Sequence, residues 1–165
     1  MQIKRTVTLL IGIVLMASVC FCMSGCGTDD IDISGYAKEK IVLSGLQDED
    51  ITLTIKDLKA MECKTVKTES TSDKIGEVKA TGPELGTILE QYGLTKEDIK
   101  SVRFHGIDEY DVPLMKDYIM EHDIYLAFGI DGEPLDAESA PCRVIIPESD
   151  SAYWIRMVNG IEFER

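Results

Sequence analysis

The sequence predicts an α+β fold, built as a single compact domain of mixed sheet with three or four short helices. Three observations support this class. Short segments with the alternating apolar pattern of strands recur along the chain, amphipathic stretches with helix-start signals lie among them, and the two kinds do not alternate strictly. No internal repeat is visible. The part of the chain that follows an N-terminal export signal is long enough for one hydrophobic core.

Strands and one short helix are predicted in the first half of the chain. The strand-like segments alternate apolar with polar residues and lie at 41–43, 51–54, 64–68 and, within an otherwise loop-like stretch at 69–80, at 77–80. Thr54 and Asp57 have the spacing of a capping box, which predicts a helix that runs to Met61.

The strongest helix signal follows residue 80. Thr81 is expected to cap this helix, with Pro83 in its first turn and Glu84 completing the box. An apolar stripe follows at helical spacing, formed by Leu85, Ile88, Leu89 and Tyr92. Gly93 is expected to end the helix. Weaker patterns predict a helical turn at 95–99 and a helix at 114–121.

The second half of the chain is dominated by strand patterns. These lie at 101–105, 124–130, 142–146, 153–158 and 161–163. Asp131 and Gly132 form the strongest two-residue hairpin signal in the chain, because both residue types tolerate the positive φ angles of a type I′ turn.

The N-terminus has the pattern of an export signal over residues 1–25. Lys4 and Arg5 precede an apolar run at 7–23, and Met23-Ser24-Gly25-Cys26 follows. This tetrapeptide resembles the lipobox of bacterial lipoproteins, with Met in the position where Leu is usual. The resemblance implies a lipid on Cys26, a flexible tether over residues 26–38 and a domain over 39–165, held on the extracytoplasmic side of the cell membrane. An uncleaved signal anchor and ordinary cleavage are the alternatives.

Charge excludes one class of partner. Without residues 1–25 the net charge falls from −13 to −15, because the signal contains Lys4 and Arg5 but no acidic residue. Such an acidic surface repels phosphate backbones, so no nucleic-acid partner is expected. Cys63 and Cys142 belong to no Cys-x-x-Cys pair, and no metal site is predicted from them. They could form a disulfide or remain two separate buried thiols.

Six segments, in order, resemble a known family. They are 41–45 with 51–58 (ITLTIKDL), 81–89 (TGPELGTIL), 102–110 (VRFHGIDEY), 126–135 (ending DGEPL), 140–147 (APCRVIIP) and 154–161. Together they resemble the small form of the sulfite-oxidase-type molybdopterin-binding domain. The resemblance covers residues 40 to 163 and implies that family's α+β fold, with molybdopterin as the candidate cofactor.

The resemblance also implies a set of site residues, and here the chain departs from the family. The family's molybdenum ligand is a cysteine thiolate, and the best alignment places Ser70 at that position. Cys63 lies seven residues earlier, which along a strand is on the order of 20 Å. Arg143 and Arg156 match the family's phosphate-binding positive residues, and Asp108 matches the turn that borders the cofactor. Glu138 stands near the position of the family's histidine, where a carboxylate would repel phosphate.

These assignments have simpler alternatives. The two arginines could be strand residues that pair with some of the chain's many acids, Asp108 and Tyr110 could serve only a turn, and His105 could be structural. The sequence favours a lipoprotein whose domain lacks the metal-ligating cysteine, has no catalytic residues and serves as a binding or accessory module. Its expected partner is a small anion or a membrane or surface protein. An active molybdenum oxidoreductase and a surface interaction module that uses loop 69–80 are the alternatives.

Overall fold

The computed structural model describes residues 30–72 and 75–165. The predicted export signal and Cys26 lie outside these residues. The strands are β1 Lys40–Ser44, β2 Ile51–Thr54, β3 Cys63–Thr68, β4 Val78–Pro83, β5 Ser101–Gly106, β6 Asp111–Met115, β7 Tyr125–Ala127, β8 Gly129–Ile130, β9 Glu133–Pro134, β10 Arg143–Ile145 and β11 Val158–Glu164. The helices are α1 Ile55–Lys59, α2 Leu85–Glu90 and α3 Lys116–Glu121, with 3₁₀ turns η1 Lys96–Asp98 and η2 Ser151–Tyr153.

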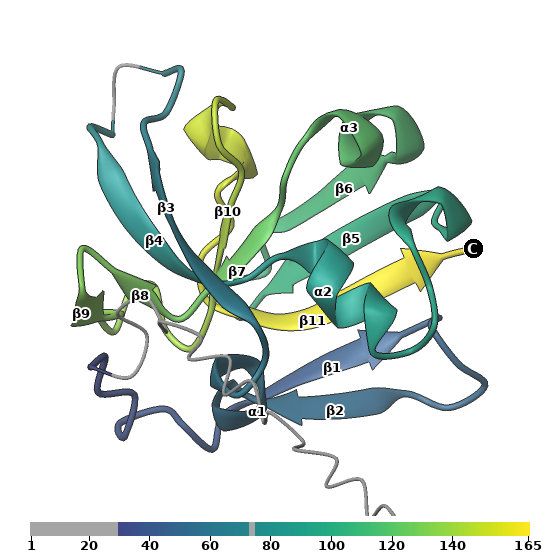
Figure 1. The fold of residues 1–165 in the computed structure, drawn as a ribbon, viewed down its shortest axis with the longest axis horizontal. Coiled ribbons are helices and arrows are strands. Elements are labelled where there is room, and N and C mark those ends of the chain that lie inside the picture. The colour runs from purple at the N-terminus through teal and green to yellow at the C-terminus, as the bar shows by residue number, and fades with distance from the viewer. Residues whose placement is uncertain (1–29, 73–74) are drawn as a thin grey trace, which may run out of the picture.

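A five-stranded sheet forms one layer of the domain (Figure 1). Its order is β2-β1-β11-β5-β6, with β1 parallel to β11 and the other neighbours antiparallel. Alternate residues of these strands are buried on one face, as the two-residue period of a strand requires. They include Ile41, Leu43, Val102, Phe104, Val112, Leu114, Ile161 and Phe163.

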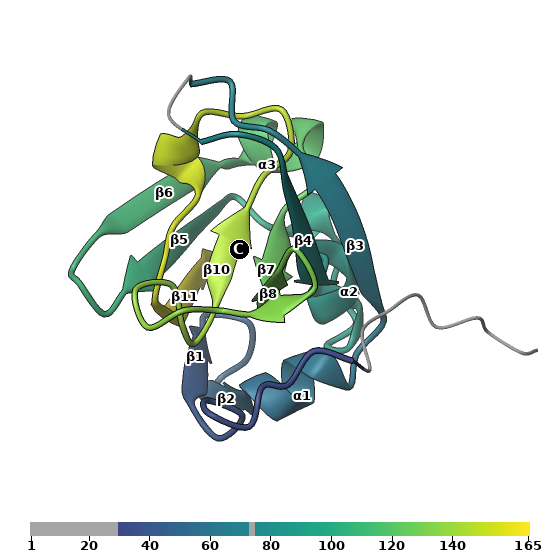
Figure 2. The same cartoon turned by 90° about the vertical axis from the view of Figure 1, so that its left-hand side faces the viewer.

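The second layer consists of a four-stranded sheet, β3-β4-β8-β9, and the pair β10-β7. Strand β4 lies directly against β7, and Gly82 makes this approach possible. A Cβ atom at Gly82 would stand 2.0 Å from the carbonyl oxygen of Leu126, so no other residue fits here without backbone movement. One core fills the space between the layers, and the helices close it (Figure 2). The predicted α+β class is confirmed.

The helix signals were correct for the first helix and partly wrong for the second. Asp57 N–H donates to Thr54 Oγ1 at 3.2 Å and Thr54 N–H donates to Asp57 Oδ2 at 2.8 Å, so the predicted capping box of α1 is formed. Helix α2 instead begins after Glu84. Thr81 belongs to β4, where its hydroxyl is 2.9 Å from that of Thr65. Strand pairing therefore overrode the local cap signal.

The apolar stripe and the end of α2 are confirmed, whereas Pro83, expected in its first turn, is the last residue of β4, and Glu84 is the N-cap residue without a side-chain cap hydrogen bond. Leu85, Ile88 and Leu89 are fully buried, so the apolar stripe faces the core. Gly93 has φ +71° and its N–H donates to Glu90 O, while Leu94 N–H donates to Leu89 O. This is the Schellman arrangement that ends a helix.

Three other assignments were wrong in part. Leu114, expected in a helix, lies in β6 opposite Val102. Of residues 153–158, expected as a strand, 153–157 form the end of η2 and an irregular segment, and Val158 begins β11. The expected strand 124–130 is divided at Phe128, whose N–H leaves the ladder to donate to Thr81 O. The Asp131-Gly132 turn is confirmed between β8 and β9, with φ angles of +55° and +82°.

The segment formed by residues 30–38 packs onto the domain, and the predicted flexible tether is therefore wrong for these residues. Ile31 and Ile33 are buried. The Tyr36 hydroxyl donates to Phe128 O at 2.6 Å and accepts from Leu135 N at 2.8 Å. The alternating apolar residues of this short polar stretch were too few to give a strand signal. Within the described ranges, no helix is long and apolar enough to cross a membrane.

Candidate functional site

Ser70 lies just beyond the end of β3 and is almost buried, with 9% of its surface exposed. Its hydroxyl is 2.8 Å from Ser72 Oγ, which in turn is 2.7 Å from Ser151 Oγ in η2. The Ser72 N–H also donates to Ser70 Oγ at 3.1 Å. The three hydroxyls form a chain that joins the end of β3 to η2, so the Ser70 oxygen is already engaged by the protein.

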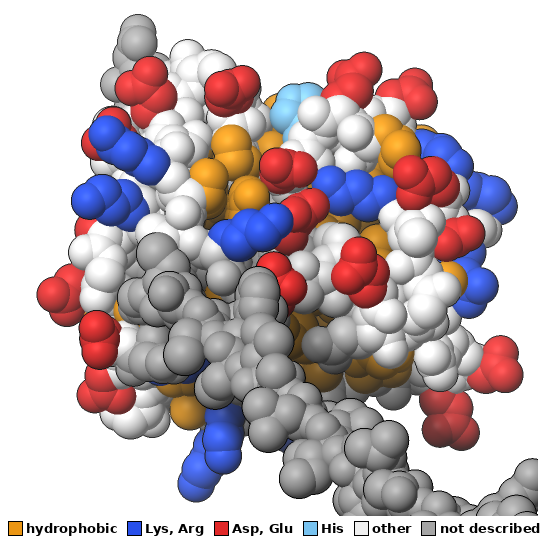
Figure 3. Space-filling view, in the orientation of Figure 1, with side chains coloured by type: hydrophobic (Ala, Val, Ile, Leu, Met, Phe, Trp, Pro, Cys, Tyr) orange, Lys and Arg blue, Asp and Glu red, His pale blue; other side chains and the backbone are white. Residues whose placement is uncertain are grey.

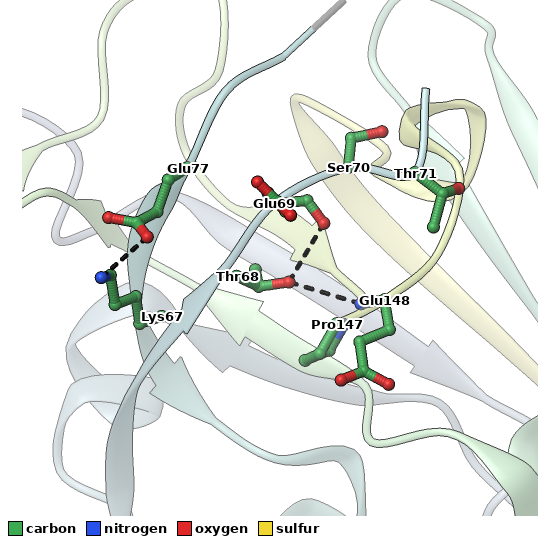
Figure 4. A pocket seen from close by; sticks show the side chains of 8 residues that line it. All are labelled: Lys67, Thr68, Glu69, Ser70, Thr71, Glu77, Pro147 and Glu148. Carbon is green, nitrogen blue, oxygen red and sulfur yellow. Dashed lines mark hydrogen bonds and ion pairs between the residues drawn. The ribbon is translucent and has the colours of Figure 1, made fainter. Parts of the chain in front are cut away.

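A cavity of about 380 Å³ opens beside Ser70 (Figure 4). It is lined by the end of β3, the start of the following loop, Glu77, Pro147 and Glu148. Lys67 is paired with Glu77 at 2.7 Å, which leaves the carboxylates of Glu69 and Glu148 to dominate the charge. The Ser70 hydroxyl points away from the Lys67–Glu77 pair. This cavity is therefore acidic and does not favour an anion.

The loop over residues 69–77 is held to the body of the domain at its start. Thr71 N–H donates to Ser149 O at 3.0 Å, and Thr68 Oγ1 accepts from Glu148 N at 3.3 Å. Of the short strand expected at 77–80, residues 78–80 form the start of β4. The backbone at the start of the loop is thus anchored and Ser70 is buried, whereas the side chains of Glu69 and Thr71 are exposed.

A second hollow of about 410 Å³ is lined by Asp108, Tyr110, Ser151, Ala152, Trp154 and Arg156. Ser151 connects it to the hydroxyl chain of Ser70. Asp108 Oδ1 accepts from Tyr110 N at 3.2 Å, and the Tyr110 hydroxyl donates to Ala152 O at 2.9 Å. These two residues hold the β5–β6 turn against η2 and border the hollow at the same time.

Arg143, in β10, and Arg156, in the irregular segment before β11, lie close enough for mutual repulsion. The Arg143 guanidinium carbon stands 5.9 Å from the centre of the Trp154 ring. Burial lowers the pKa of Arg143, the charge of Arg156 lowers it further, and Asp136 opposes these effects. The Arg143 Nε is fully buried and has no acceptor among the residues that the structure describes. A half-buried guanidinium over an aromatic ring, with a second guanidinium close enough to repel it, forms a site that favours an anion.

The acidic neighbours only partly neutralise this site. Arg156 Nη1 is 3.8 Å from Glu138 Oε2, and the Glu138 side chain is 85% exposed. An exposed pair at this distance contributes little, so an incoming anion can displace it. Glu138 therefore competes for Arg156 rather than blocking it.

Trp154 is fixed in position by its own hydrogen bonds. Its Nε1 donates to Ile146 O at 2.8 Å and lies 3.2 Å from Ser149 Oγ, and only 3% of its surface is exposed. Sequence reasoning did not assign Trp154 or Ser151 to the site. Trp154 is the only tryptophan of the chain and lies two residues before Arg156, which was an available signal; Ser151 had none.

Metal-binding groups do not meet at either hollow. The described residues contain no group of three or more His, Cys, Asp or Glu side chains placed to hold a metal ion. Cys63, at the opposite end of β3 from Ser70, directs its Sγ toward Leu58 O at 3.5 Å, and burial raises its pKa to about 11. Cys142 is fully buried, which raises its pKa, and neither cysteine forms a disulfide.

The remaining predicted residues fall into two groups. The structure gathers Arg143, Arg156 and Asp108 around Trp154, and it joins Ser70 to them only through the serine hydroxyls. His105 lies on the outer face of the five-stranded sheet, with Nδ1 3.1 Å from Asp111 Oδ2, away from both hollows. The donor set fits an anionic group, such as the phosphate of a pterin cofactor, but does not fit a thiolate-bound metal.

Comparisons with known proteins agree with this fold. The family model described as "Oxidoreductase molybdopterin binding domain" matches residues 30–165. Among solved structures, the chain resembles the sulfane dehydrogenase SoxCD from Paracoccus pantotrophus with a TM-score of 0.65 at 19% sequence identity, over 77% of this chain and 38% of that chain. The chain thus spans less than half of that protein chain, and the likeness shows a shared fold alone. No curated protein matches the chain.

Proposed function

The chain belongs to the oxidoreductase molybdopterin-binding domain family, and from this premise we propose that it is a membrane-anchored, extracytoplasmic lipoprotein whose domain binds a small anionic ligand as an accessory module. A family does not by itself fix an activity, so the site must decide. The proposal assigns the domain no independent redox reaction.

The observation that carries the proposal is the state of Ser70. The family resemblance assigns this position to the metal-ligating thiolate, and here it holds a hydroxyl bonded to Ser72. A serine hydroxyl is a far weaker acid than a thiol and a harder ligand, so it is a poor substitute in a site built for soft sulfur. Of the two thiols in the described chain, Cys63 stands at the start of the same strand and Cys142 is enclosed in the core.

The anion site supports a binding role. Arg143 contributes a buried Nε–H that lacks an acceptor, and Arg156 contributes a guanidinium whose only carboxylate partner in the described chain is a weak, exposed one. A bound anion would satisfy the former and replace the latter. The proposed ligand is a phosphate-bearing molecule of the pterin class or another small anion, held beside Trp154.

Thermal unfolding in the presence of pyrophosphate and inorganic phosphate tests this proposal. A ligand present at 100 times its dissociation constant stabilises the folded state by about 2.7 kcal/mol. We expect stabilisation of the wild type at constant ionic strength and its loss in Arg143→Ala. Arg103→Ala is the matched control, since Arg103 lies on the outer sheet surface near Glu162. Equal stabilisation of all three proteins, or none of the wild type, would contradict an anion site at Arg143.

The lipid anchor has its own test. Intact mass measurement of the protein extracted from membranes should show cleavage before Cys26 and the added mass of a diacylglycerol, and Cys26→Ser should abolish both. Recovery of an unmodified chain that retains residues 1–25 would exclude the lipoprotein assignment and leave the anion site untouched.

A further inference from the structure

Residues 30–38 are attached to the domain at Ile31, which follows Cys26 by five positions in the sequence. Lys59 Nζ donates to Ile31 O at 2.7 Å, which fixes the segment to the end of α1. On its other side, Ile31 packs so closely on Gly129 of β8 that a Cβ there would lie 2.6 Å from Ile31 Cδ1. With Ile31 99% buried, residue 31 cannot leave this position without opening the core.

The chain between the proposed lipid and this attachment point is short. Cys26 and Ile31 are separated by five residue steps, and a fully extended chain spans at most about 3.5 Å per residue. The Cα of Ile31 therefore lies within about 18 Å of the Cα of Cys26, whatever path the chain takes. Acyl chains on Cys26 insert into the bilayer from its surface, so the surface around Ile31 must lie near the headgroups.

Charge favours the same orientation. The membrane-proximal face, which we define as residues 30–40 with 55–59, contains four lysines (38, 40, 56 and 59) and four acidic residues (30, 32, 39 and 57), so it is neutral. The rest of the domain, residues 41–54 and 60–165, contains 11 basic and 25 acidic residues. A negatively charged lipid surface repels such regions and tolerates the neutral one. In Figure 3, acidic and basic side chains are interspersed, and the side in view has no large basic patch that would offer a negatively charged membrane another binding surface.

We propose that the membrane-proximal face rests on the lipid headgroups and that the domain is held there in one orientation. This inference rests on the proposed lipid anchor. Figures 1 and 2 both place α1 at one end of the domain and the loop between β3 and β4 at the other. Strand β3 starts near α1 and ends near Ser70, on the order of 20 Å further from the lipid. The end of the domain that contains Ser70 and its cavity is thus the end farther from the lipid.

Quenching of a fluorescent label tests this orientation. The mature lipoprotein carrying Lys56→Cys or Lys67→Cys is labelled with a thiol-reactive fluorophore and reconstituted into vesicles that contain a headgroup-linked nitroxide lipid. The native thiols interfere little, because Cys142 is buried and the pKa of Cys63 is raised to about 11. We expect strong quenching at position 56, on the membrane-proximal face, and little at position 67, at the far end of β3.

A third variant tests whether the short connection, and not lipidation alone, holds the domain in this orientation. Insertion of a 12-residue Gly/Ser linker after Gly27 lengthens the connection between Cys26 and Ile31 from five to 17 residue steps. It should greatly reduce quenching at position 56 while vesicle binding persists. Equal quenching at 56 and 67, or quenching at 56 that is insensitive to the linker, would overturn the proposed orientation. A protein that fails to bind vesicles and lacks the acyl mass would refute the anchor itself, which the mass measurement detects independently.

Discussion

Replacement of Arg143 by methionine should stabilise the ligand-free domain, although most substitutions of half-buried residues destabilise a protein. The Arg143 Nε–H is buried without an acceptor in the described chain, and the neighbouring charge of Arg156 and burial both disfavour its charged form. Methionine keeps much of the length and the apolar contacts of arginine but introduces no polar hydrogen. The substitution therefore removes two unfavourable contributions together.

The magnitude follows from opposing contributions at this residue. An unsatisfied buried donor costs about 1–3 kcal/mol, and release from the repulsion of Arg156 adds to the gain. The lost interaction of Arg143 with the Trp154 ring, 5.9 Å away, offsets about 0.5–1 kcal/mol. We therefore expect a net increase of about 1 kcal/mol in the free energy of unfolding, or about 3–5 °C in Tm for a domain of this size.

Urea unfolding followed by far-ultraviolet circular dichroism measures this change, since the fluorescence of Trp154 is itself affected by Arg143. The matched control is Arg103→Met, which removes an exposed arginine on the opposite sheet face and should change stability by less than about 0.5 kcal/mol. The same Arg143→Met protein should gain nothing from pyrophosphate. A loss of 1 kcal/mol or more in Arg143→Met would show that the guanidinium stabilises the fold, and the assignment of Arg143 to ligand binding would fail.

Three further outcomes are expected from the fold. Gly82→Ala should destabilise the domain by about 3 kcal/mol or prevent folding, because the new Cβ meets a β7 carbonyl oxygen at 2.0 Å, whereas Gly35→Ala, with no atom within 4 Å, should be neutral in the same denaturation assay. Asp57→Ala should lower the free energy of unfolding by about 0.5–1 kcal/mol at neutral pH, because the capping box is lost. The hydrogen bonds from Thr54 hold the folded pKa of Asp57 below 3.8, so the difference from wild type should be full above pH 3.8 and vanish as the pH falls through the folded pKa. A difference that grew in acid would refute this reasoning. Cys63 should react slowly with iodoacetamide at pH 8 because its pKa is raised to about 11, and Cys142 should react only on unfolding, as timed mass measurements would show.

The fold was predictable where the local signal and the tertiary structure agree. The capping box at Thr54 and the stripe from Leu85 to Leu89 needed only short-range chemistry, and both are present. The start of α2 was not predictable from Thr81, because a threonine that fits a helix cap also fits a strand. Its partner in β3 decided between them, and that pairing joins residues 16 positions apart.

The N-terminal segment shows a different limit. Residues 30–38 are polar enough to resemble a tether, yet Ile31 and Ile33 enter the core and the Tyr36 hydroxyl bridges two backbone groups about 90 or more positions away. No pattern within the segment itself predicts these contacts. A buried surface supplied by distant parts of the chain is what orders it.

The candidate site was predicted in its charges but not in its arrangement. Arg143, Arg156 and Asp108 were identified through their resemblance to a family pattern, and the structure places them around one tryptophan. The bonding of Ser70 to Ser72 and Ser151 depends on side-chain direction, which sequence spacing cannot supply. That bonding supports the proposal that this position no longer serves a metal.

Molybdenum and pterin analysis of the purified protein tests that proposal most directly. The wild type and Ser70→Cys are expressed in a host that makes the molybdenum cofactor and are purified in parallel, and metal and pterin are measured per chain. We expect substoichiometric molybdenum in the wild type and a higher content in Ser70→Cys, where a thiol is restored at the position that the family resemblance assigns to the ligand and both arginines are retained. One molybdenum and one pterin per wild-type chain would contradict it.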